Sequence, residues 1–316
     1  DTAISFTGTA VVSRTVAGTS YMGLTAAQFS NTSANFTNVT FVVHDGWLKI
    51  DPKSIIPDGP DTPDEKKTGI EVTDPDDSVY DGLPHVNPLT VTDTKTGTTL
   101  VKDTDYTLSY SEDVINVGTV DVTVNGIGNY TGEFKKSYKI TPREYTVTTD
   151  SAKKVYDGTA LTAGGKIEGI VSGETVEFTT TGSRTDEGTS KNTYSLKWNG
   201  SAIETNYKLA KESIGDLTVT PKSIIPDEPN TPDDKKTGIT VSDPKDSKYD
   251  GQEHREVLTV KDIKTGKDLI ANKDYTVVYS DDLVNAGTVK VTVTGLGNYS
   301  GSFTKTYKIT KRLVTL

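Results

Sequence analysis

Two short markers recur in this sequence at one spacing, and they constrain the fold more than any other feature. The tripeptide Tyr-Asp-Gly is followed about fifty residues later by Asn-Tyr. The tripeptides are Tyr80-Asp81-Gly82, Tyr156-Asp157-Gly158 and Tyr249-Asp250-Gly251, and the dipeptides are Asn129-Tyr130, Asn206-Tyr207 and Asn298-Tyr299. Markers that recur at a fixed period indicate one structural unit used several times.

The longest internal match divides the chain into repeats of two types. Segment 53–140 returns at 222–309 without insertion, 169 positions later, with about three positions in five identical. Segment 142–221 carries its own pair of markers, and the first fifty residues match its later part. The predicted order is a partial B-type β module (B0, 1–52), an extended linker (53–68), an A-type β module (A1, 69–141), a B-type module (B1, 142–221), a second extended linker (222–237), a second A-type module (A2, 238–311) and the first strand of a further B-type module (312–316).

Comparison of the two A copies separates core positions from surface positions. Val120, Val122 and Val124 return as valines, whereas the intervening Asp121 becomes Lys290. Alternate conserved apolar positions are typical of a strand that buries one face. Short strands separated by regular turn signals predict an all-β chain of small Ig-like β-sandwich modules, or alternatively β-grasp-like modules, in an elongated array.

Both predicted linkers, 53–68 and 222–237, are rich in Pro, Asp and Lys. Proline favours polyproline II and charge favours extension, so each would span at most about 45 Å. The A-to-B connections near 141–142 and 310–311 are far shorter. We therefore expect rigid A–B pairs separated by semi-rigid spacers.

The composition excludes several classes of function. The net charge is −10, and no basic stripe with interleaved aromatic residues is present, so we expect no nucleic-acid binding. No apolar run approaches the roughly 20 residues that cross a bilayer, so this fragment should not insert into a membrane. No signal peptide is recognisable, and we expect the chain to be part of a longer protein. The absence of cysteine excludes disulfides and thiolate metal sites.

Several motifs resemble the MBG/YDG-type repeats of Gram-positive bacterial cell-surface adhesins. The resemblance is carried by Val155-Tyr156-Asp157-Gly158 with Asn206-Tyr207 in B1. The A modules resemble the Ig-like repeats that often accompany them, through 105–107, 116–119 and 126–132. The resemblance implies an extracellular, cell-wall-anchored location and a stalk that projects a distal binding region. It implies, alternatively, a module that binds host mucin, glycan or a matrix protein.

Tyr-Asp-Gly has a structural and a functional interpretation. Asp bonds nearby backbone N–H groups, Gly adopts a positive φ and Tyr packs in the core, which makes the tripeptide a turn. A ligand-facing tyrosine beside a catalytic or metal-binding Asp is the alternative. Its presence in modules with different surfaces favours the turn.

A lysine on an apolar strand face suggests a covalent crosslink. Lys136 shares its parity with Phe134, Tyr138 and Ile140, and Lys305 takes the same position in A2. The resemblance to Gram-positive adhesins implies a Lys–Asn isopeptide bond catalysed by a carboxylate; the alternative is a strand-end lysine whose amino group reaches water. The partners would be Asn116 and Asn129 with Asp81 or Asp105, and Asn285 and Asn298 with Asp250 or Asp274.

We predict no catalytic or cofactor site and no enzyme activity. His85 and His254 are one position in two copies, next to the tripeptide turn. Calcium is the alternative at the acidic runs around Asp74 and Asp243, although Asp76 becomes Lys245. Trp47 and Trp198 are either sugar-stacking or core residues, and the alternating pattern favours the core for Trp198.

The chain ends suggest head-to-tail self-association. B0 lacks an opening strand and a tripeptide, and the final residues repeat the first strand of a B module. That terminal strand would complete B0 of another molecule by strand addition.

Overall fold

The computed structural model describes residues 3–315, and the chain divides into two compact units. Unit 1 comprises Asp1–Arg143 and Thr205–Tyr207, and unit 2 comprises Glu144–Glu204 and Lys208–Leu316. Within the described residues the helical elements are three short 3-10 helices, η1 (Ala26–Gln28), η2 (Asp64–Lys66) and η3 (Glu204–Asn206), with no α-helix. The all-β sandwich prediction is therefore confirmed, whereas the β-grasp alternative lacks its helix.

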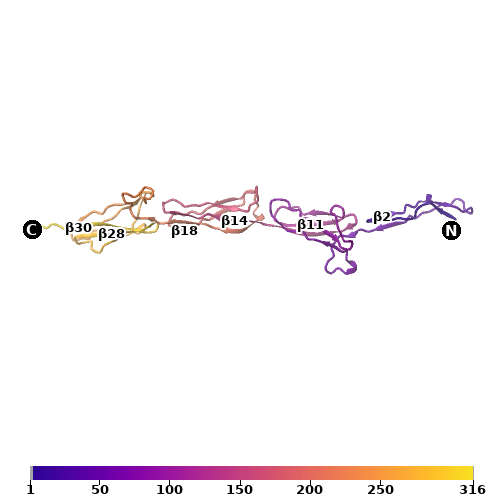
Figure 1. Cartoon of the computed structure of the whole chain (residues 1–316), viewed down its shortest axis with the longest axis horizontal. Coiled ribbons are helices and arrows are strands. Elements are labelled where there is room, and N and C mark those ends of the chain that lie inside the picture. Colours follow the sequence, from indigo (N-terminus) through magenta and orange to yellow (C-terminus); the bar gives the residue numbers. More distant parts are fainter. Residues whose placement is uncertain (1–2, 316) are drawn as a thin grey trace. The chain divides into compact units, whose positions relative to one another are not determined.

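A1 contains one four-stranded sheet, in the order β10-β11-β13-β7, and one three-stranded sheet, in the order β6-β8-β9. Its longest strands, β11 and β13, are antiparallel, and β11 is labelled in Figure 1. The strands of A1 are β6 (Ile70–Val72), β7 (Ser78–Val79), β8 (Val91–Asp93), β9 (Thr98–Thr99), β10 (Tyr106–Tyr110), β11 (Gly118–Gly126), β12 (Tyr130–Thr131) and β13 (Glu133–Thr141).

A2 repeats this arrangement, with sheets in the orders β24-β30-β28-β27 and β23-β25-β26. Its strands are β23 (Ile239–Val241), β24 (Ser247–Lys248), β25 (Val260–Asp262), β26 (Lys267–Asp268), β27 (Tyr275–Tyr279), β28 (Gly287–Gly295), β29 (Tyr299–Ser300) and β30 (Ser302–Thr310). The predicted strand face is the core face, because Val289, Val291 and Val293 are at most 1% exposed while Lys290 points to solvent.

B1 is built from two three-stranded sheets, β16-β14-β20 and β15-β21-β18, and the pair β17-β19. Its strands are β14 (Arg143–Thr149), β15 (Ala152–Val155), β16 (Gly165–Glu168), β17 (Glu177–Thr180), β18 (Gly188–Lys191), β19 (Tyr194–Lys197), β20 (Tyr207–Ser213) and β21 (Asp216–Thr220). Strand β15 runs parallel to β21, and β18 pairs with the other edge of β21 in the antiparallel sense.

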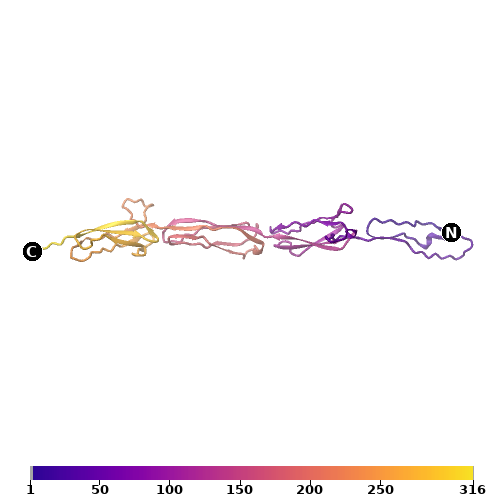
Figure 2. The ribbon, with the colours of Figure 1, turned by 90° about the horizontal axis from the view of Figure 1, so that it is seen from below.

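B0 is an open structure in which no described residue is fully buried. It consists of two strand pairs, β1-β3 and β2-β4, and Figure 2 shows it in indigo and purple as a wide loop. Its strands are β1 (Ile4–Phe6), β2 (Gly18–Tyr21), β3 (Phe29–Asn31) and β4 (Trp47–Ile50). The described part of B0 aligns in sequence with B1 from β17 onward.

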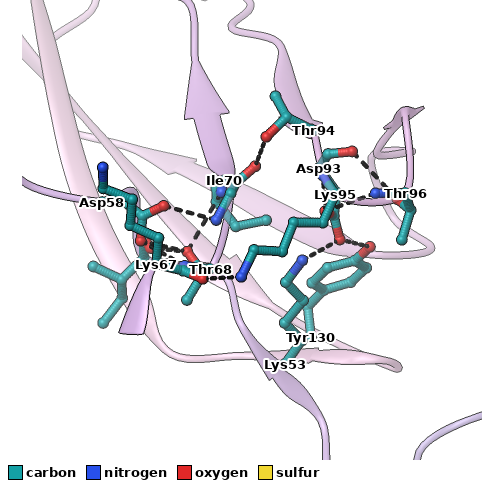
Figure 3. Close-up of polar contacts among 12 residues, drawn as sticks. Lys53, Asp58, Lys67, Thr68, Ile70, Asp93, Thr94, Lys95, Thr96 and Tyr130 are labelled. Atoms are coloured by element: carbon teal, nitrogen blue, oxygen red, sulfur yellow. Dashed lines mark hydrogen bonds and ion pairs between the residues drawn. The ribbon is translucent and has the colours of Figure 1, made fainter. Parts of the chain in front are cut away.

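The predicted extended linkers are not what the structure shows. Segment 53–68 begins with β5 (Lys53–Ser54), which pairs in parallel with β12, and its Ile55 is fully buried. The Asp58 carboxylate then accepts hydrogen bonds from the backbone N–H groups of Thr68 and Gly69, each 2.7 Å long, which closes the segment into a loop (Figure 3). The composition of this segment predicted an extended conformation. The buried Ile55 side chain and the hydrogen bonds from backbone N–H groups to Asp58 instead hold it in a folded loop.

Segment 222–237 is folded in the same way. Strand β22 (Lys222–Ser223) pairs with β29, Ile224 is fully buried, and Asp227 closes the loop on Thr237 and Gly238. Since β21 ends at Thr220 and β22 begins at Lys222, the expected semi-rigid spacer between B1 and A2 does not exist. A single residue, Pro221, lies between their strands.

Candidate functional site at the module joint

Unit 2 brings the two sequence markers together. The ring of Tyr156, from the B1 tripeptide, meets the ring of Tyr299, from the A2 dipeptide, edge to face with centroids 5.6 Å apart and planes at 73°. Each side chain is only 2% exposed. We call the group formed by Tyr156, Lys222, Asp262, Asn298 and Tyr299 the B1–A2 joint.

The backbone places the B1 tripeptide where the chain leaves its module. Strand β15 runs parallel to β21, and the Tyr156 N–H that follows it donates to the carbonyl of Thr220 at 2.8 Å. Because β21 is the last strand of B1, Tyr156 arrives beside Pro221 and the start of the next module. Tyr156 and Val219 accordingly belong to the same buried hydrophobic cluster as the A2 core.

The Asp and Gly of the tripeptide form the turn that follows Tyr156. The Asp157 carboxylate accepts the N–H of Thr159 at 2.9 Å, and Gly158 has a φ of 79°. The other copies have the same bond, from Leu83 to Asp81 and from Gln252 to Asp250. The hydrogen bond of Lys154 to Asp157 is the largest influence that lowers the pKa of this carboxyl to about 2.

A buried carboxylate organises the A2 side of the joint. Asp262 is fully buried, and its oxygens contact the Lys222 amino group at 2.6 Å and the Tyr299 hydroxyl at 3.1 Å. Backbone N–H groups of Lys264 and Thr265 donate to the same carboxylate at 3.1 and 3.3 Å. Burial, followed by the negative charge of Asp262, raises the pKa of Tyr299 above its usual range. These bonds satisfy a charge that would otherwise be costly to bury.

Polar contacts flank the aromatic pair on both sides. The Lys267 amino group donates to the Tyr156 hydroxyl at 2.7 Å and lies 5.4 Å from the centroid of that ring. Asn298 of the dipeptide donates to the Asp186 carboxylate at 2.8 Å and accepts the Glu187 N–H at 2.6 Å. The dipeptide asparagine and tyrosine therefore both contact the preceding module.

A1 carries the same polar cluster in a more open form (Figure 3). Asp93 contacts the Lys53 amino group at 2.6 Å and the Tyr130 hydroxyl at 3.2 Å. The Lys53 side chain is 30% exposed, whereas its counterpart Lys222 is 6% exposed. In A2, the ring of Tyr156 from the preceding module packs on Tyr299 of the cluster. Burial works to raise the pKa of Asp93, but the Lys53 hydrogen bond and charge outweigh it and lower that pKa.

Unit 1 contains the marker contact a second time, through its Thr205–Tyr207 segment. The rings of Tyr80 and Tyr207 meet edge to face at 5.6 Å and 77°. Asn206 is fully buried; its side chain accepts the Val117 N–H at 2.9 Å and donates to the Asn116 side chain at 2.8 Å. The tripeptide tyrosine and the dipeptide asparagine thus take the same roles as in the B1–A2 joint.

The tyrosine of the third tripeptide, Tyr249, is packed against no Asn-Tyr dipeptide of the described residues, and it is more exposed than the other two. Tyr249 is 39% exposed, compared with 4% for Tyr80 and 2% for Tyr156. Its backbone geometry is unchanged, because Gly251 has a φ of 84° and the Tyr249 N–H donates to Thr310. The expectation that this tyrosine packs in the core of its own module is therefore wrong for Tyr249, since the burial comes from outside the module.

The residues of the predicted isopeptide bond have other partners here. The Lys136 amino group forms an ion pair with Asp74 at 2.5 Å, and Lys305 pairs with Asp243 at 2.7 Å. The predicted asparagines Asn116, Asn129, Asn285 and Asn298 contact Asp113, Ala17, Asp282 and Asp186, respectively. The crosslink stays a prediction, and the geometry instead fits the alternative of a lysine whose amino group reaches the surface.

The other candidate residues form no assembled site among the described residues. No group of three or more His, Asp or Glu side chains is arranged to hold a metal in residues 3–315. His85 and His254 lie 3.0 Å from the tripeptide carboxylates Asp81 and Asp250. The Trp198 ring packs edge to face on Tyr145, whereas Trp47 is 61% exposed.

No protein-family model and no curated protein matches the chain, so the MBG/YDG assignment stays a prediction. Among solved structures, the chain is similar to the I9–I11 tandem of titin, with 11% identity, a TM-score of 0.23 and coverage of 77% of this chain and 100% of that one. It is also similar to PcdhgB3 EC1–4, with 13% identity, a TM-score of 0.17 and coverage of 67% and 65%. Neither likeness indicates what this chain binds. No helix in the described residues is long and apolar enough to cross a membrane.

Proposed function

We propose that this chain is a structural stalk and adhesive repeat region of an extracellular, cell-wall-anchored bacterial adhesin, which holds a distal binding region away from the cell. The observation that carries the proposal is the B1–A2 joint. One residue separates the two modules, and Tyr156 and Val219 of B1 lie in the same buried cluster as the A2 core. Such a connection transmits position and force rather than leaving each module to rotate freely.

The cost of bending this joint follows from what it buries. A tyrosine side chain buries about 150–250 Å² in a packed contact. At about 25 cal/mol per Å², exposing one ring costs about 4–6 kcal/mol. Bending would also strip hydrogen bonds from Asn298 and Tyr156. A stalk needs this resistance at each connection, and an isolated binding domain does not.

Small-angle X-ray scattering tests the stalk directly. The wild-type chain should give the profile of an elongated particle, and a four-residue Gly-Ser insertion after Pro221 should give a more flexible, more compact average. The same insertion within the exposed Pro232–Asp234 turn of A2 is the matched control. A compact globule for the wild type would refute the stalk. Labelling of intact bacteria with an antibody against this fragment tests the surface location separately.

A specific observation favours a second candidate function, binding of host mucin or glycan. Tyr21 and Trp47 are directly opposite each other on β2 and β4, and are 65% and 61% exposed. Their counterparts in the more complete B1 module, Lys191 and Asp216, form an ion pair with side chains 62% and 48% exposed. The exposure therefore belongs to this face of the module and is not caused by missing strands. Adjacent exposed aromatic rings suit the apolar face of a sugar.

A glycan array and a mucin pull-down discriminate the two candidates. Saturable binding by the wild type that is lost in Trp47→Ala and retained in Lys191→Ala would support the glycan site. Absence of saturable binding would refute the glycan site and leave the stalk as the remaining proposal.

A further inference from the structure

Segments 53–69 and 222–238, which we call the A1 strap and the A2 strap, combine the composition of an extended linker with a folded conformation. Each contains three proline residues, and its buried side chains all lie within its first three residues. We propose that each strap is a reserve of length, which tension along the chain releases while the sandwich behind it stays folded. The inference rests on the proposed stalk, because only a chain under tension would use such a reserve.

The A2 strap is anchored at its start by a short contact with the rest of A2. Strand β22 pairs in parallel with β29, and the Lys222 N–H donates to the Asn298 carbonyl at 2.9 Å. The Ile224 N–H donates to the Ser300 carbonyl at 2.8 Å. The fully buried Ile224 side chain and the contact of Lys222 with Asp262 complete the anchor. Such a small unit can open without the whole module.

A second set of bonds closes the A2 strap on itself. The Asp227 carboxylate accepts the backbone N–H groups of Thr237 and Gly238, each at 2.7 Å, and the Thr237 hydroxyl at 2.8 Å. Between these residues, no side chain of 228–236 is buried. Figure 3 shows the same closure in the A1 strap, where Asp58 holds Thr68. One carboxylate therefore keeps an otherwise exposed segment compact.

The composition of the strap favours an extended state once that closure is lost. Proline restricts a released chain to extended conformations, and the charged residues 233–236 keep it solvated. Because proline lowers the conformational entropy of the released chain, less entropy has to be lost when the strap folds back. The strap therefore suits a reversible exchange between a folded and an extended state.

Tension along the chain acts lengthwise on the anchor. It enters A2 through Pro221, directly before β22, and passes on through β30, which follows β29 after Gly301. Because β22 and β29 are parallel, pulling them in opposite directions slides one along the other and loads both backbone hydrogen bonds together. The anchor therefore holds up to a threshold tension and then opens in a single step.

The sandwich behind the strap keeps its own core when the anchor opens. Apart from Ile224, the A2 residues of the buried cluster all follow the strap, from Ile239 to Ile309. Strand β24 also remains paired in parallel with β30. The connection from A1 to B1 has no comparable segment, since a single residue separates β13 from β14. In the described residues, length is therefore stored at the entry to each A module.

The released length distinguishes the strap from the sandwich. At about 3.3–3.6 Å per residue, the chain from Lys222 to Ile239 spans at most about 55–60 Å, and the chain from Ile239 to Thr310 about 240–260 Å. Single-molecule force spectroscopy of the whole chain resolves these lengths. The wild type should show one short step of up to about 55–60 Å for each strap, at a lower force than the long steps of the sandwiches.

An insertion within the strap gives the decisive test. Eight Gly-Ser residues placed between the exposed Asp233 and Asp234 should lengthen one short step by about 26–29 Å and leave the long steps unchanged. The matched control is the same insertion between the exposed Gln252 and Glu253, in a loop of the A2 sandwich. It should lengthen one long step by that amount and leave the short steps unchanged.

Loss of the closing carboxylate should weaken one strap alone. Asp227→Ala should lower the force of one short step or remove that step, whereas Asp233→Ala, which removes a 94% exposed side chain paired with Lys236, should not. A wild type without short steps, a strap insertion that lengthens a long step, or equal effects of the two aspartate variants would each overturn the strap. An elongated scattering profile without short steps would refute the strap and leave the stalk in place, so the two proposals fail separately.

Discussion

Replacing Tyr156 by alanine should destabilise two modules at once. The side chain is 2% exposed, and truncation of a large buried aromatic residue costs about 3–5 kcal/mol. The edge-to-face contact with Tyr299 accounts for about 0.5–1.5 kcal/mol of this. Because the ring lies in the A2 cluster although it belongs to B1, the loss should appear in both modules.

Tyr249→Ala is the matched control, since it alters the same residue of the same tripeptide. Tyr249 is 39% exposed, so its remaining burial supports a cost of about 2–4 kcal/mol at 25 cal/mol per Å². Its effect should be confined to A2. The expected difference between the two variants is therefore about 1 kcal/mol, with a different distribution over the modules.

Native-state hydrogen exchange followed by mass spectrometry measures the loss of stability and the module in which it occurs. Peptides from β21 report on B1, and peptides from β28 report on A2. Equal losses in the two variants, or a Tyr156→Ala effect limited to B1, would refute the reasoning that the joint is a shared core.

Three further changes test the parts of the joint. Asp262→Ala leaves the Lys222 ammonium buried without its partner and should cost about 3–5 kcal/mol in urea unfolding, whereas Asp93→Ala should cost less, because Lys53 is 30% exposed and can reach water. Gly158→Ala should destabilise more than Gly251→Ala: both positions have a positive φ, but a Cβ at Gly158 lies 3.2 Å from Thr265 and nothing lies within 4 Å of Gly251. The pKa of Asp157 is lowered from 3.8 to about 2, so its contribution is present above pH 4 and lost as the pH falls toward 2; Asp157→Asn should remove that part of the acid dependence of unfolding monitored by circular dichroism.

The sequence predicted the strand faces well and the connections poorly. Burial on one strand face leaves a period of two, so the valines of β11 and β28 were identified correctly from comparison of the two copies. Segments 53–68 and 222–237 were misinterpreted because Pro, Asp and Lys dominate their composition. The informative residues in them were few: Ile55, Ile224 and the loop-closing Asp58 and Asp227.

The joint itself could not be predicted from one module at a time. Sequence reasoning identified Tyr156 and Asn298 as markers, but it assigned each to its own module because a repeat pattern contains no information about which copies touch. The spacing held a usable signal, since Lys222 and Asp262 also recur as Lys53 and Asp93. A lysine and an aspartate that are both retained in the two copies are compatible with a buried ion pair.

The exposure of Tyr249 indicates why the two markers recur in several copies. A residue that is kept for the stability of its own module is buried in every copy, as the three valines of β28 are. Tyr249 keeps its turn, its backbone hydrogen bond and its identity, but it is exposed, because the contact that buries Tyr80 and Tyr156 comes from a different repeat. The retained identity therefore reflects a requirement of the assembly of modules and not of the single sandwich. Tyr-Asp-Gly and Asn-Tyr are the two halves of one connection, and each is complete only when a neighbouring module supplies the other.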